Sequence, residues 1–137
     1  MAKESKKSKN RTVWCDRSWF PFYFGFVPDK ASWEIETKEL GYDGQYIERG
    51  AACDTLKTNL GRTVVLVTMS EKCDDLDAVG LTGLMVHEAT HVFDAMLRAM
   101  GEKKPSSEFK AYSVQCIYQQ LMEAYIKTRN KKLFVND

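Results

Sequence analysis

The chain has 137 residues, of which 44% are hydrophobic and 28% charged, and its net charge at neutral pH is +1. This length predicts a single domain with one modest core, and the composition is typical of a soluble globular protein. No apolar run reaches the roughly 18 residues that a membrane span needs. The basic N-terminus also lacks the apolar stretch of a secretory signal, so we expect a cytoplasmic protein.

Basic residues gather near both ends of the chain. Residues 1–11 and 127–132 each carry a charge of +4, whereas the body between them is acidic. A basic arm can contact nucleic acid or an acidic partner, and a solvated terminus is the simpler interpretation. No nucleic-acid-binding signature favours the first alternative. The sequence therefore predicts a flexible basic arm over residues 1–12, one domain over 13–130 and a flexible tail over 131–137.

The first half of the domain predicts strands and one helix. The run "TVWCDRSWFPFYFGFVP" is rich in aromatic residues that favour extended structure, and packing in the core is the simpler interpretation than a ligand-binding clasp. A short helix is expected next, with Asp29 or Ser32 as its N-cap and Gly41 as its stop. Strand segments should then surround a turn at residues 59–61, and the clearest of them covers Thr63 to Met69.

Two long helices are predicted in the second half. Aspartates at 74, 75 and 77 offer N-caps for a helix over about 77–100, which Gly101 ends. A serine at 106 or 107 begins a second helix that continues to about residue 129. The four cysteines are scattered without metal-ligand spacing, so we expect small, partly buried free thiols.

The first of these helices carries both histidines of the chain, in "MVHEATHVF". His87 and His91 are four residues apart, so they project about 40° from each other on neighbouring turns and can meet at one metal ion. Glu88 projects about 100° away, where it can hold a metal-bound water as general base. A chance occurrence of this pattern is on the order of one in a thousand. The alternative is a core helix with two hydrogen-bonded histidines.

A catalytic zinc ion needs a third protein ligand, which must be a carboxylate or a thiolate because no third histidine exists. Glu108 in the first turn of the next helix is the preferred candidate, since an antiparallel return would bring it past the histidines. Glu123 lies over about 20 Å farther along that helix. The alternative for Glu108 is an acid that stabilises the helix N-terminus.

"MVHEATHVF" followed by "SSEFKAYSVQCIY" resembles the gluzincin metallopeptidases, and more closely the small metallopeptidases encoded by tailed bacteriophages and prophages. The resemblance is detailed over residues 80–120. It implies zinc ligation by His87, His91 and Glu108, with Glu88 as base. Larger gluzincins have an aspartate four residues after the ligand glutamate, where this chain has Tyr112.

The sequence leaves open which residues would support the zinc ligands and the base. Asp94 could orient a histidine or be an ordinary acid. A tyrosine could stabilise the oxyanion, and Tyr112, Tyr118 and Tyr46 are the candidates, with Tyr112 named first. The Thr63 to Met69 strand, if it forms a sheet edge above the helix, could align an extended peptide.

Together these features predict an α+β fold, namely a minimal zincin-like (gluzincin) domain with a small, mainly antiparallel sheet packed on the histidine helix and the glutamate helix. The expected function is a zinc-dependent peptidase that acts on a peptide or protein of phage or host, with no membrane or nucleic-acid partner. The alternative is a non-catalytic zinc-binding phage protein that serves as an interaction module.

Overall fold

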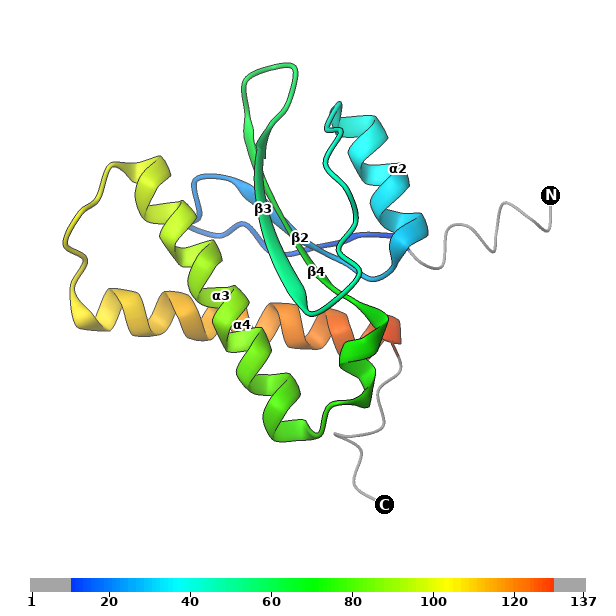
Figure 1. Cartoon of the computed structure of the whole chain (residues 1–137). Coiled ribbons are helices and arrows are strands. Elements are labelled where there is room, and N and C mark those ends of the chain that lie inside the picture. Colours follow the sequence, from blue (N-terminus) through cyan, green and yellow to red (C-terminus); the bar gives the residue numbers. More distant parts are fainter. Residues whose placement is uncertain (1–10, 130–137) are drawn as a thin grey trace.

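The computed structural model describes residues 11–129, which form a small α+β domain with a four-stranded sheet and three α-helices (Figure 1). The predicted tail over 131–137 and most of the predicted basic arm lie outside the described residues. In chain order the elements are β1 (Val13–Trp14), β2 (Tyr23–Val27), α2 (Lys30–Leu40), β3 (Ala51–Lys57), β4 (Thr63–Met69), the short 3-10 helix η2 (Glu71–Asp75), α3 (Ala78–Met100) and α4 (Ser107–Arg129).

The sheet has the strand order β1-β2-β4-β3. The pairs β1–β2 and β3–β4 are antiparallel, as the sequence predicts for most of the sheet. The central pair β2–β4 is parallel, with Tyr23 opposite Val64 and Val27 opposite Thr68. The chain makes this parallel connection through α2 and β3, because a return in the same direction needs a long crossover.

The position of Thr63–Met69 corrects one sequence-based expectation. This segment does form a strand with the predicted bounds, but β4 pairs with a neighbour on both sides and is not a sheet edge. Its residues are almost all buried, and a run buried on both faces explains why its sequence lacks polar alternation. The edge that lies beside the histidine helix is β3, which pairs only with β4.

Helix α2 covers one face of the sheet and begins and ends where its caps predict. The Asp29 side chain accepts a hydrogen bond from the backbone N–H of Ser32 at 2.8 Å. Gly41 ends the helix in the left-handed conformation, with a φ of 73°. Trp33 packs with Val64 and Leu66 of β4 in a small core on this face, together with Val27 and Leu56.

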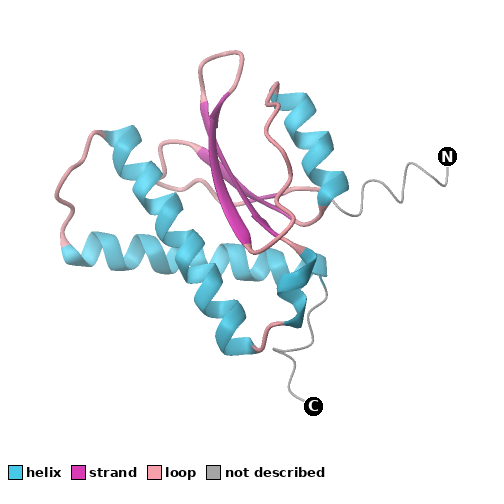
Figure 2. Ribbon diagram, in the orientation of Figure 1, coloured by secondary structure: helices cyan, strands magenta, loops and turns pink. Residues whose placement is uncertain are grey.

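Helices α3 and α4 cover the other face, where the larger core lies (Figure 2). Alternate residues of β4, Val65 and Val67 among them, pack against this pair of helices. The sheet therefore separates two apolar layers. Most of the aromatic run is part of these layers, as expected, since Phe20, Phe24 and Phe26 are at most 1% exposed.

The two long helices match their predicted bounds. The Asp77 carboxylate caps α3 by accepting the N–H of Gly80 at 2.7 Å, and Gly101 ends it with a φ of 68°. The Ser106 hydroxyl accepts the N–H of Phe109 at the start of α4. In Figure 1 the helices cross near their middles, so the first turn of α4 lies away from the central turns of α3.

The C-terminal end of α4 is anchored to the sheet. The Arg129 side chain, which is 8% exposed, pairs with Asp74 at 3.0 Å and donates hydrogen bonds to backbone carbonyls near the ends of β2 and β4. The interpretation of the basic residues near the C-terminus as a solvated terminus therefore does not hold for Arg129. Within residues 11–129, no helix is both long and apolar enough to cross a membrane.

Candidate functional site

Helix α3 brings the two histidines of the chain together. The Nε2 atoms of His87 and His91 lie 3.1 Å apart, and both side chains are exposed. Two nitrogens bound to one tetrahedral zinc ion at about 2.05 Å would be separated by about 3.3 Å. The pair therefore fits two ligands of one metal ion. The same distance also permits a hydrogen bond between the rings, with either one as the donor.

Glu88, between the histidines in the sequence, is almost fully buried at 3% exposure. Its Oε2 atom is inaccessible to solvent and has no hydrogen-bond partner among the described residues. Burial raises the pKa of the Glu88 carboxyl, and the neighbouring His91 and His87 oppose that rise. A buried carboxylate oxygen without a partner is costly in a purely structural role, so the Glu88 carboxyl, which borders the same cavity as the two histidines, is available to accept a proton.

These three side chains line a cavity of about 270 Å³ between α3 and the edge strand β3. On the strand side the cavity is lined by Ala51, Ala52, Cys53 and Thr55, and Arg98 lines it from farther along α3. Burial raises the pKa of the Cys53 thiol to about 12, with Glu88 adding to the rise. The thiol is therefore protonated at neutral pH. The alanines at 51 and 52 have small side chains, so they leave the strand backbone close to the cavity.

The structure does not bring Glu108 to this cavity. Among residues 11–129, no group of three or more His, Cys, Asp or Glu side chains is placed to hold a metal ion. The reason lies in how the helices pack. The Phe109 ring contacts Phe93, with centroids 6.1 Å apart. Phe93 projects about 200° around α3 from His91. The first turn of α4 therefore packs on the face of α3 opposite the imidazoles, and Glu108 itself is exposed.

None of the three candidate tyrosines lines the histidine cavity. Tyr112 is 64% exposed on α4. Tyr46 packs against Trp33 on the other side of the sheet, 6.2 Å between ring centroids. Tyr118 packs partly buried against the larger core. Asp94 is exposed, and no hydrogen bond joins it to either histidine in the part of the chain that the structure describes.

Sequence reasoning missed Thr55 and Arg98. A signal for Arg98 exists, because a residue seven positions after His91 returns to within about 20° of the same direction on a helix. For Thr55 there is none, since the segment before the turn at 59–61 has no clear alternation that would mark it as the edge beside the histidines. The four cysteines are free thiols, as expected, and Cys53 is the one that lines the cavity.

Comparisons of the chain with protein-family models, with curated proteins and with solved structures found no match.

Proposed function

We propose that this protein is a zinc-dependent peptidase with a minimal zincin-like domain. The observation that carries the proposal is the partnerless, buried Oε2 of Glu88 beside two histidines whose Nε2 atoms face each other at 3.1 Å. The H-E-x-x-H spacing gives each of these residues a role that a structural helix does not need. The substrate class that this chemistry supports is a peptide or protein.

In this proposal His87 and His91 hold the zinc ion through their Nε2 atoms. When bound, zinc supplies Lewis-acid polarisation and lowers the pKa of its water toward 7. Glu88, whose side chain lines the histidine cavity, accepts the proton of the attacking water at its carboxylate and delivers it to the nitrogen of the departing amine. Because burial raises the pKa of Glu88, its carboxyl is a better proton acceptor than an exposed glutamate would be.

The edge strand β3 offers a way to align the substrate. One side of β3 pairs with β4, and its other side has no partner strand among residues 11–129. An extended peptide can add to such an edge by backbone hydrogen bonds. Four residues of this strand line the same cavity as the histidines: Ala51, Ala52, Cys53 and Thr55. A peptide paired here would therefore pass directly beside His87 and His91.

Glu108 as the third zinc ligand stays a prediction from the sequence resemblance. Its exposed position in the first turn of α4 leaves it outside the histidine cavity, so ligation needs a shift of that turn toward the other face of α3. Zinc affinity of Glu108→Ala tests this role. If Glu108 is a ligand, the affinity falls by an amount comparable to that of His91→Ala.

A second candidate function, a non-catalytic zinc-binding module, is favoured by one observation. Cys53 lies in the same cavity as the histidines, and a thiolate in place of a water would close the metal site. The raised pKa of Cys53 weighs against it, because ligation requires the thiol to lose its proton. Loss of zinc binding in Cys53→Ser would support this function, and unchanged zinc binding would argue against it.

The deciding experiment is a comparison of the wild-type chain with Glu88→Gln, both loaded with zinc. We expect each to bind one zinc ion, while peptide cleavage measured by mass spectrometry falls by about 10²–10⁴-fold in the variant. Glu102→Gln, which changes an exposed glutamate just after α3, is the matched control and should keep full activity. Retained cleavage by Glu88→Gln would reject the assigned base.

A further inference from the structure

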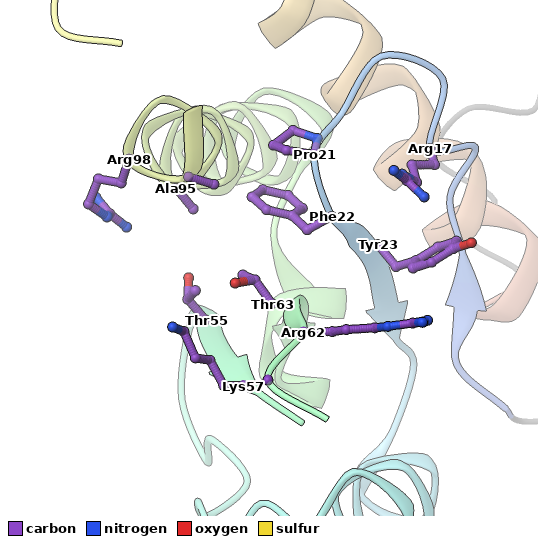
Figure 3. A pocket seen from close by; sticks show the side chains of 12 residues that line it. Arg17, Pro21, Phe22, Tyr23, Thr55, Lys57, Arg62, Thr63, Ala95 and Arg98 are labelled. Carbon is purple, nitrogen blue, oxygen red and sulfur yellow. The ribbon is translucent and has the colours of Figure 1, made fainter. Parts of the chain in front are cut away.

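A larger, basic cavity adjoins the histidine site. It has a volume of about 840 Å³ and lies between the C-terminal half of α3, the end of β3 and the segment that precedes β2 (Figure 3). Thr55 and Arg98 line both this cavity and the histidine cavity. The two cavities therefore adjoin each other in the space between α3 and β3.

The lining of this second cavity is strongly cationic. Arg17, Lys57, Arg62 and Arg98 all contribute to it, and no aspartate or glutamate of the described residues does. None of the four forms a salt bridge with another residue in the range 11–129. Four exposed positive charges thus line one cavity, although the body of the chain is acidic overall. Such a concentration attracts anionic groups of a ligand.

The cavity walls suit a carboxylate with a short apolar stem. Arg17 is held in place, since its Nε donates to the carbonyl of Phe20 at 3.1 Å and its guanidinium lies 5.3 Å from the centre of the Tyr23 ring. In the view of Figure 3, Arg98 and Lys57 lie at one side of the cavity and Arg17 at the other. Pro21 and Phe22 supply apolar wall between them.

The geometry also places these charges at a defined distance from the histidines. Arg98 lies seven residues after His91, which is about 10.5 Å along the axis and nearly the same direction around it. The intervening Ala95 is small and lines the cavity, so it leaves room there. On the strand, Thr55 and Lys57 point to the same face, about 7 Å apart. A peptide paired with β3 would therefore place a side chain beside Lys57 two to four residues from the bond next to the histidines.

We infer that this basic cavity binds acidic side chains of the substrate, so that the peptidase selects peptides with aspartate or glutamate two to four residues from the cleaved bond. The inference rests on the proposed function for the location of the cleaved bond. A peptide is favoured over nucleic acid because the basic cavity adjoins the histidine site beside the edge strand β3. Arg98, which lines both cavities, and Lys57, which follows Thr55 by two residues on β3, are the specificity-determining residues.

The binding part of the test uses zinc-loaded Glu88→Gln protein, which cannot consume its ligand. The probes are three fluorescein-labelled ten-residue peptides that are identical except for four positions occupied by Glu, Gln or Lys, and binding is read by fluorescence anisotropy. The Glu peptide should bind at least about tenfold more tightly than the Gln peptide, the effect of one charge-assisted hydrogen bond. Adding Lys57→Ala and Arg98→Ala should abolish this preference.

The matched control carries Arg49→Ala and Lys110→Ala, which remove the same two residue types from exposed positions that do not line the cavity. It should keep the preference for the Glu peptide. Equal binding of the Glu and Gln peptides, or an equal loss in the control, overturns the inference. So does a thymidine oligonucleotide that displaces the Glu peptide at a lower concentration than unlabelled Glu peptide does.

Cleavage of a peptide library by the wild-type protein separates the two proposals. Products enriched in aspartate or glutamate two to four residues from the cut support the inference. Cleavage without that enrichment overturns the inference and leaves the peptidase function standing. Selective binding of the Glu peptide without any cleavage refutes the peptidase function. The assignment of acidic ligands to the basic cavity then still holds.

Discussion

Replacement of Arg129 by alanine should be among the most destabilising changes outside the core. The Nη1 atom donates to the carbonyls of Pro28 at 2.7 Å and Met69 at 2.8 Å, and Nη2 donates to the carbonyl of Ser70 at 2.9 Å. The same guanidinium pairs with Asp74 at 3.0 Å. One side chain therefore joins the end of α4 to the ends of β2 and β4.

The size of the effect follows from these contacts. Breaking a buried ion pair by removing one partner costs about 3–5 kcal/mol, and each buried acceptor left without a donor costs about 1–3 kcal/mol. Asp74 is 38% exposed on its side chain, so water can replace part of its interaction with Arg129. We therefore expect Arg129→Ala to lower the free energy of unfolding by about 3 kcal/mol. For a chain of this length, that corresponds to a fall in Tm of roughly 10 °C.

Urea unfolding followed by circular dichroism measures this change directly. Lys127→Ala is the matched control, because Lys127 is exposed in the same last turn of α4 and should change stability by less than about 0.5 kcal/mol. Arg129→Lys keeps the charge but loses the fork of donors, so its stability should lie between the two. A free energy of unfolding for Arg129→Ala within about 1 kcal/mol of wild type would refute the anchoring role.

Three further outcomes can be checked with purified protein. Zinc at one hundred times its Kd should stabilise the wild-type chain by about 2.7 kcal/mol and His91→Ala by far less, as differential scanning fluorimetry with and without a chelator would show. Burial raises the pKa of Glu36 above its ordinary value near 4.5, so the stability present below pH 4.5 should be lost as pH rises through the raised pKa. Glu36→Gln should flatten that dependence of Tm on pH, and an unchanged slope would contradict it. Gly101→Ala should cost about 1 kcal/mol in urea unfolding, because the φ of 68° strains any residue with a Cβ atom.

The helices could be predicted closely because their signals are local. Asp77 and Gly101 bound α3 through hydrogen bonds to residues only a few positions away, and Asp29 and Gly41 do the same for α2. The juxtaposition of His87 and His91 is equally local, since helix geometry alone places side chains four residues apart on one face. These parts of the candidate site depend on no contact between distant segments.

The remaining features depend on such contacts. Whether β4 lies in the middle of the sheet is decided by its parallel pairing with β2, which joins residues about 40 positions apart. The place of Glu108 is decided by which face of α3 receives α4, and Phe109 against Phe93 sets that choice. A hydrophobic pattern shows that a face is buried but does not show what covers it. For this reason the sequence predicts that the second long helix runs back past the histidines. In the structure the first turn of α4 packs instead on the opposite face of α3.

The two edge strands of the sheet, β1 and β3, limit self-association in different ways. Strand β1 is only two residues long, so it offers little backbone to a second molecule. Strand β3 is seven residues long, and its exposed Lys57 and partly buried Asp54 place charge on it. Charged side chains, lysine above all, discourage the pairing of one molecule's sheet with another's. The residue proposed to recruit an acidic substrate would thus also protect the protein from aggregation, and its neutralisation should lower solubility.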